Sequence, residues 1–353
     1  MNRTRDFGPL AGDLPAQNYL CCSEWVSWEL PWGDLNRGGG FWRWGKPNLA
    51  SLPDTSSNSD PNYDSWRPLL ELLRIRHWIK GLFILLPLPF AVASGVDLHP
   101  ENLILGILGF SLVSSSVYIF NDIQDRHRDQ HHPLKCQRPI AAGVIRPMVA
   151  FWWGIVVLGI GMTILGLPGI LKPYSPEPWL LALIYLGGNG IYTFWARSLA
   201  WLDALFLASF FLLRLYLGCT LSQISPSATL LSTGFLLAFS LALGKRYSEL
   251  ISGYDGEYRS SLNQYRQEIL VKILILTVAC CWGCYLWYCW TSPLISQERW
   301  WWSAIVSGFG LYKYMNETIR ERSAREPVAM ILESIWPRWV IPIWIILVIL
   351  SIE

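Results

Sequence analysis

Apolar runs alternate with short polar stretches from about residue 79 to the end of the chain. Many of these runs approach the roughly 20 residues that an α-helix needs to cross a bilayer. We predict nine membrane-spanning segments, at residues 79–96, 102–120, 147–168, 178–196, 201–222, 228–243, 269–290, 300–315 and 336–351. The expected fold class is therefore all-α, a polytopic membrane protein with about nine transmembrane helices.

The composition agrees with that reading. Of the 353 residues, 52% are hydrophobic and 15% are charged, which is too apolar a balance for an ordinary soluble domain. A formal net charge of +2, with no clustered basic arm, argues against a nucleic-acid partner. Residues 1–65 are rich in Gly, Pro, Ser, Asn and Asp, so we predict an irregular cytoplasmic N-terminal extension there and a membrane domain over 66–353.

The basic residues predict the orientation. Nearly all Lys and Arg after residue 65 lie on one side of the predicted segments, in loops that include 121–146 and 244–268. The positive-inside rule places this side in the cytoplasm, and nine segments then place the C-terminus outside. Polar residues gather at the cytoplasmic helix ends. This favours an enzyme at the inner face of a bacterial plasma membrane over a transporter, whose polar broken helices would lie near mid-membrane.

One polar group follows an apolar segment directly, in the sequence NDIQDRHRD at residues 121–129. On a helix, Asn121, Asp122, Asp125 and Asp129 fall within an arc of about 100°. Mg²⁺ takes one or two carboxylates together with waters and substrate phosphate oxygens. We therefore predict the three aspartates to be catalytic Mg²⁺ ligands, with Asn121 binding substrate beside them. The ordinary alternative, a solvated loop, would not require the acids to share a face.

Basic residues occur near the aspartates and again in a second polar stretch, GKRYSEL at residues 244–250. Lys135 and Arg138 follow the aspartates in the same loop, and the later stretch GKRYSEL places Lys245, Arg246 and Glu249 on one helical face. Lys binds phosphate as a point charge and Arg binds it in bidentate fashion. We predict all five residues to bind substrate, the cations by contacting phosphate.

NDIQDRHRD followed by HPLKCQRPIAAGVI resembles the first aspartate-rich motif of the UbiA superfamily of intramembrane prenyltransferases, NDxxDxxxD with a downstream HPxKxxRPIAxG. The resemblance spans roughly residues 66–351. It implies a nine-helix UbiA-like bundle as the catalytic domain, with Mg²⁺ and a pyrophosphate-bearing substrate held at the cytoplasmic face. Most members carry a second aspartate-rich motif after the sixth helix, where this chain has GKRYSEL.

That departure resembles one branch of the superfamily, the decaprenyl-phosphate phosphoribosyltransferases. RIRHWIKG at 74–81 is similar to their opening R-x-x-x-W-x-K-N, with Gly81 in place of Asn. The stretch at 192–218 is similar to their Y-S-x-x-L-K…D…LR…G, and EPVAMIL at 326–332 is similar to a late EPxxxxL motif. The resemblance implies four further substrate-binding residues: Lys80, Arg197 (in place of Lys), Asp203 and Arg214. For Arg214, an intramembrane charge, pairing with another helix is an equal alternative.

The resemblance implies Mg²⁺-dependent transfer of 5-phosphoribose from phosphoribosyl pyrophosphate to a polyprenyl phosphate, with release of pyrophosphate. Two alternatives remain. One is a prenyltransferase that moves an isoprenyl chain onto an aromatic or other acceptor, and the other is a non-catalytic lipid-binding or transport protein. Cys281 and Cys284 form a CxxC within an apolar run, where we expect helix packing and not a zinc site. The acceptor chain length and the oligomeric state stay open.

Overall fold

The computed structural model describes residues 66–132, 135–171, 177–252, 261–320 and 334–352. The predicted extension at 1–65 and the EPVAMIL stretch lie outside these ranges. The described part is helical, and its elements are α1 (Arg67–Leu72), η1 (Ile75–Leu85), α2 (Leu88–Ala93), α3 (Pro100–Gln130), η2 (Lys135–Gln137), α4 (Pro147–Leu171), α5 (Glu177–Phe194), η3 (Ala196–Ser198), α6 (Leu202–Leu221), α7 (Ala228–Ser252), η4 (Leu262–Gln264), α8 (Gln267–Thr291), α9 (Trp300–Ile319) and α11 (Ile335–Ser351).

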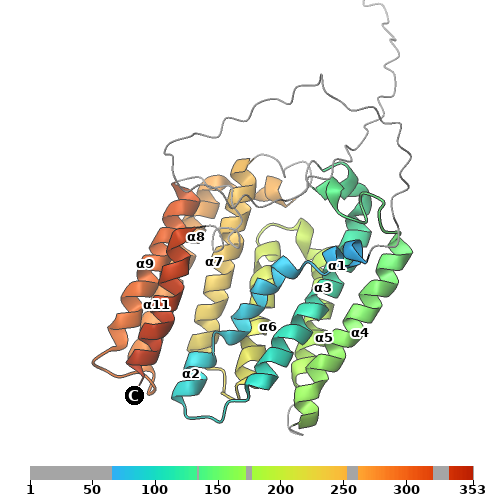
Figure 1. Ribbon diagram of the computed structural model, residues 1–353. Helices are drawn as coiled ribbons and strands as arrows, with labels where there is room; N and C mark the ends of the chain where they lie inside the picture. The colour runs from blue at the N-terminus through green and yellow to red at the C-terminus, as the bar shows by residue number, and fades with distance from the viewer. Residues whose placement is uncertain (1–65, 133–134, 172–176, 253–260, 321–333, 353) are drawn as a thin grey trace, which may run out of the picture. The chain divides into compact units, whose positions relative to one another are not determined.

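The long helices pack against one another largely in chain order (Figure 1). Contacts join α3 to α4, α5 to α6, α6 to α7, α7 to α8, α8 to α9 and α9 to α11. The 3₁₀ helix η1 packs against both α3 and α6, and α11 contacts α2. Consecutive helices run in opposite directions, so the C-terminal ends of α3 and α7 meet the N-terminal end of α6 at one end of the bundle, uppermost in Figure 1.

Eight of the nine predicted segments correspond to one helix each, from α3 to α11. Within the ranges that the structure describes, six helical stretches are long and apolar enough to cross a membrane, the first of them formed by α1, η1 and α2 together. At 17 residues, α11 is a shorter apolar helix. An all-α membrane protein is thus confirmed, while the count of nine spans stays a prediction.

The first predicted segment, 79–96, is not one continuous α-helix. Arg74 has a left-handed backbone with φ of 50°, and the chain then runs as a 3₁₀ helix to Leu85. Pro87 lies between η1 and α2 as the N-cap of α2, and Pro89 is in the first turn of α2. Proline has no backbone N–H and its ring blocks the preceding turn, so the hydrophobic run alone could not reveal the break.

Two helices continue past the predicted boundaries into the expected cytoplasmic loops. α3 extends to Gln130, through the whole of NDIQDRHRD, and α7 extends to Ser252, through GKRYSEL. Hydropathy falls at these places although the helical hydrogen bonding continues. Both polar groups therefore stand on rigid helix ends, which fixes the spacing of their side chains.

The buried core lies between the helices. One cluster joins side chains of η1, α3, α4, α5 and α6, including Phe110, Leu165 and Leu217. Another joins α6, α7, α8 and α9, including Leu243, Leu270 and Tyr314. Many large apolar side chains remain exposed on the outer faces, for example on α4, α8 and α11. In a membrane protein such faces contact lipid.

Candidate active site

The aspartates of NDIQDRHRD occupy the last three turns of α3. Because α3 stays helical to Gln130, Asp122, Asp125 and Asp129 lie on one face, as their spacing predicts. Asp122 and Asp129 are each 5% exposed, whereas Asp125 is half-buried. Carboxylates this enclosed require compensating charge.

Three arginines supply that charge, each from a different segment. Arg74 donates to both oxygens of Asp122 at 2.5 and 2.7 Å. Arg138 bridges the helix face, donating to Asp122 Oδ1 at 3.0 Å and to Asp129 Oδ2 at 2.6 Å. Arg197 forms a bidentate pair with Asp125 at 2.8 and 3.0 Å. We call these three aspartates and three arginines the aspartate cluster.

Further cations surround the cluster. Arg128 lies 3.7 Å from Asp125. Lys80 Nζ lies 3.4 Å from the hydroxyl of Tyr118, one helical turn before Asp122, and the Arg74 guanidinium lies 5.3 Å from the centroid of the same ring. Among the residues named around this cluster, cations outnumber carboxylates. The excess positive charge at this end of α3 favours binding of an anion.

Sequence reasoning did not select Arg74 as a site residue. A signal was present, because Arg74 is the first residue of the quoted RIRHWIKG stretch. It lies 48 positions before Asp122, however, and helical spacing cannot relate residues on separate segments. The other two arginines, Arg138 and Arg197, were predicted and do reach the aspartates.

Asn121 and Lys135 lie at the edge of the aspartate cluster. Thr193 of α5 donates from its hydroxyl to Asn121 Oδ1 at 3.1 Å, so Asn121 faces α5. Lys135 is half-buried in η2, and its backbone N–H donates to His132 at 3.3 Å. Their predicted contacts with substrate stay predictions.

A second group, which we call the α7 cluster, consists of Asp203, Lys245, Arg246 and Glu249. Arg246 is 1% exposed; it forms an ion pair with Asp203 at 3.3 Å and a short one with Glu249. Lys245 Nζ lies 4.0 Å from Glu249, and 31% of its side chain is exposed. Arg246 is thus enclosed between two acids, and Lys245 is the more accessible cation.

Arg214 lies apart from both clusters, within α6. Its guanidinium donates to the carbonyl of Phe210 at 2.9 Å and to Ser114 Oγ at 3.1 Å. It also lies 5.0 Å from the centroid of the Phe110 ring and 5.2 Å from that of Tyr185. Cation–π contacts of this kind stabilise a desolvated guanidinium. These contacts give the intramembrane charge a packing role, and substrate binding by Arg214 stays a prediction.

The donor set of the aspartate cluster is suited to a hard cation. Within the described ranges, no three His, Cys, Asp or Glu side chains come close enough together to hold a metal by themselves. Mg²⁺ needs only one or two carboxylates when waters and substrate phosphates complete its shell. The aspartates of α3 therefore fit a Mg²⁺ site that the substrate completes.

The two CxxC cysteines differ in their surroundings: Cys281 contacts a neighbouring helix, and Cys284 is half-buried. Both lie on α8 as free thiols. Cys281 is buried, with its sulfur 3.6 Å from the carbonyl of Thr233 on α7.

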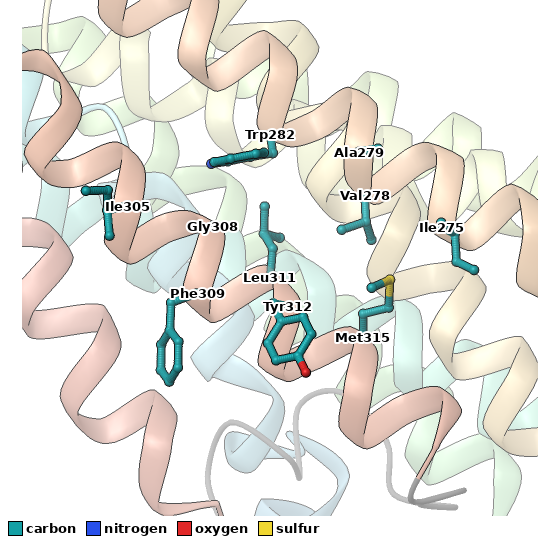
Figure 2. A pocket seen from close by; sticks show the side chains of 10 residues that line it. All are labelled: Ile275, Val278, Ala279, Trp282, Ile305, Gly308, Phe309, Leu311, Tyr312 and Met315. Atoms are coloured by element: carbon teal, nitrogen blue, oxygen red, sulfur yellow. The ribbon is translucent and has the colours of Figure 1, made fainter.

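An apolar cavity of about 540 Å³ lies between α8 and α9 (Figure 2). Its walls include Trp282, Phe309, Tyr312 and Met315. None of the predicted site residues lines it, so this cavity is distinct from the polar clusters.

The UbiA prenyltransferase family matches residues 82–348. The chain belongs to this family. The decaprenyl-phosphate phosphoribosyltransferase of Mycolicibacterium smegmatis is 30% identical over 234 residues, which cover 62% of this chain and 69% of the relative. An uncharacterized protein of Sinorhizobium fredii, y4nM, is 34% identical over 181 residues. That match covers 51% of this chain but only 34% of the relative, so the chain spans about a third of that protein's length.

The solved structure of a UbiA homologue from Archaeoglobus fulgidus, bound to GPP and Mg²⁺, matches with a TM-score of 0.60 at 17% identity. The match covers 80% of this chain and 96% of the homologue. Membership of the UbiA family makes this chain an integral membrane transferase with a UbiA-type helical fold, as the sequence resemblance implied.

Proposed function

We propose that the chain transfers 5-phosphoribose from phosphoribosyl pyrophosphate to a decaprenyl-type polyprenyl phosphate at the cytoplasmic membrane face, with release of pyrophosphate. The observation that carries the proposal is the α7 cluster, in which Lys245 and Arg246 lie in the stretch where the family resemblance leads us to expect a second aspartate-rich motif. The similarity to the M. smegmatis decaprenyl-phosphate phosphoribosyltransferase supports the same donor.

The number of cations near the two clusters fits the number of phosphate groups on this donor. Phosphoribosyl pyrophosphate carries a pyrophosphate and a 5-phosphate, whereas a prenyl diphosphate carries one pyrophosphate on an apolar chain. Cations outnumber carboxylates around the aspartate cluster, and Lys245 is a partly exposed cation of the α7 cluster, so each cluster can offer a cation to a substrate with phosphates at both ends. Fixed cations aimed at the phosphates stabilise the charge that develops as pyrophosphate departs.

The bond changes need little proton transfer. An oxygen of the lipid phosphate attacks C1 of the ribose, the bond from C1 to pyrophosphate breaks, and the pyrophosphate leaves with the electron pair. The attacking phosphate is already ionised at neutral pH, so no strong general base is needed. We expect Lys80 and Arg197 to hold the lipid phosphate, and Lys135 and Arg138 to hold pyrophosphate.

The three aspartates of α3 would hold the cofactor. Asp122, Asp125 and Asp129 would bind Mg²⁺, which when present would neutralise the pyrophosphate oxygens. Because each aspartate is paired with an arginine in the structure, we expect substrate entry to move guanidinium groups from carboxylate to phosphate oxygens. The arginines thus keep the acids compensated until substrate and metal arrive.

The donor can be tested with purified protein in lipid nanodiscs. Phosphoribosyl pyrophosphate and a prenyl diphosphate are offered separately and then in competition, each with Mg²⁺, decaprenyl phosphate and an aromatic acceptor. We expect pyrophosphate release with the first donor only. Release with the prenyl diphosphate alone would establish the prenyltransferase alternative, and release with neither would leave a lipid-binding or transport role.

A further inference from the structure

The backbone at Trp201 adopts a rare turn just before α6. Trp201 has φ of 67° and ψ of −46°, and the N–H of Leu202 donates to the carbonyl of Ala200 at 2.8 Å. This is a γ-turn with positive φ, a strained conformation for a residue with a bulky side chain. Such strain persists only where the surrounding structure enforces it.

The hydroxyl of Tyr265 contacts both this turn and Asp203, a member of the α7 cluster. It accepts from the backbone N–H of Trp201 at 2.8 Å and donates to Asp203 Oδ1 at 2.6 Å. The Tyr265 ring packs edge-on against the Trp201 indole, with centroids 4.9 Å apart. Burial, and then the neighbouring Asp203, raise the pKa of Tyr265, so its hydroxyl stays protonated and can donate this hydrogen bond.

The residue before Tyr265 holds the same segment. Gln264 donates from Nε2 to the carbonyl of Ser198 at 3.0 Å, and its Oε1 accepts from the N–H of Ala200 at 3.2 Å. Side chains at 264 and 265 therefore satisfy backbone groups at 198, 200 and 201. Such bonds are specific to one backbone conformation, because they depend on the directions of the N–H and C=O groups.

The segment 197–203 has a proposed site residue at each end. At its start, Arg197 pairs with Asp125 of the aspartate cluster. At its end, Asp203 pairs with Arg246, which also holds Glu249. A change in the turn between them moves one side chain relative to the other.

We propose that Tyr265 is a positioning residue, which holds the turn at Trp201 so that Arg197 meets Asp125 while Asp203 meets Arg246. Tyr265 touches no reacting atom; it acts by fixing the aspartate cluster and the α7 cluster relative to each other. The kinetic part of this inference rests on the proposed function, whereas the structural part does not.

The test compares Tyr265→Phe with Tyr288→Phe. Tyr288 is a buried tyrosine at the far end of α8, so its substitution also deletes one buried hydroxyl. In Tyr265→Phe we expect amide hydrogen exchange in peptides covering 197–203 to rise by roughly tenfold or more, because the substitution removes both hydrogen bonds of the hydroxyl, to Trp201 and to Asp203. Tyr288→Phe leaves exchange in this segment unchanged. Equal exchange in the wild type and Tyr265→Phe would overturn the proposal.

Steady-state kinetics supply the second measurement. We expect Tyr265→Phe to raise the KM for phosphoribosyl pyrophosphate and the KM for polyprenyl phosphate, each roughly tenfold, because the turn positions Asp203 at one end and Arg197 at the other. A general loss of folded protein would instead lower kcat and leave both KM values unchanged, and that result would refute a positioning role. If the wild type does not use this donor, the proposed function fails, and the exchange measurement still decides the role of Tyr265.

A second variant covers the case in which Tyr265→Phe does not fold. Gln264→Ala removes the bonds to Ser198 and Ala200 and keeps the Tyr265 hydroxyl. We expect a smaller rise in exchange over the same peptides and a smaller rise in the donor KM. No change in either quantity would contradict the proposal that η4 and Tyr265 hold this turn.

Discussion

Asp125 and Arg197 are bound to each other by two hydrogen bonds, although we propose one as a metal ligand and the other as a phosphate-binding cation. Asp129 and Arg138, with the same two proposed roles, are joined by one hydrogen bond of 2.6 Å. Pairing opposite charges avoids the free-energy cost of burying a charge without a partner. At the scale of single residues, the site therefore consists of ion pairs. We expect a phosphate to bind the arginine of such a pair and a metal cation to bind its aspartate.

Asp125→Asn tests the metal role. The amide keeps the size of the side chain and removes its charge, so we expect turnover to fall by at least about 100-fold, the effect of losing a key electrostatic group. Asp97→Asn, at an exposed position between α2 and α3, is the matched control and keeps full activity. Mg²⁺-dependent activity in Asp125→Asn equal to the wild type would refute the role.

Arg74→Gln tests a residue that only the structure brought into the site. Loss of its charge-assisted bonds to Asp122 costs about 1.5–3 kcal/mol, so we expect kcat/KM to fall by roughly 10- to 100-fold. Arg76→Gln, two positions along and exposed, is the control. Equal kcat/KM values for the two variants would show that Arg74 serves no purpose in catalysis.

At the scale of elements, the sequence predicted what lies along one helix better than what lies between helices. The shared face of Asp122, Asp125 and Asp129 followed from helical spacing alone. The break at Pro87 and the pairing of Arg74 with Asp122 did not, because they depend on how η1 sits between α3 and α6. Likewise Asp203 and Arg246 were both predicted as site residues, but their mutual ion pair, and the hydrogen bond from Tyr265 to Asp203, arise from tertiary packing.

Gly218→Ala tests the packing of η1 on α6. A Cβ at Gly218 would lie 2.1 Å from the backbone carbonyl oxygen of Ile84, and backbone cannot rotate away as a side chain can. We expect the free energy of unfolding to fall by about 1–3 kcal/mol, as for other overpacked cores. Gly187→Ala on α5, where a Cβ meets no atom within 4 Å, is the control in thermal unfolding in detergent. Equal midpoints for the two variants would contradict this close contact.

At the scale of the whole molecule, both polar clusters lie at one end of the bundle, and α11 ends at the other (Figure 1). The arrangement agrees with the predicted cytoplasmic site and external C-terminus. Alkaline phosphatase fused after Glu353 folds into an active form only outside the cytoplasm. We therefore expect the fusion to be active in bacterial cells, and a green fluorescent protein fusion at the same place to be dark. The reverse pattern would contradict the predicted orientation.

The central claim concerns which part of the donor reaches the lipid, and position-specific labelling of phosphoribosyl pyrophosphate measures it directly. The wild type in nanodiscs is incubated with decaprenyl phosphate, Mg²⁺ and donor labelled with ³²P either in the 5-phosphate or in the pyrophosphate. Our account predicts that the 5-phosphate label enters the organic phase with the lipid and the pyrophosphate label stays in water. If neither label enters the lipid, or if the pyrophosphate label does, the proposed reaction is wrong.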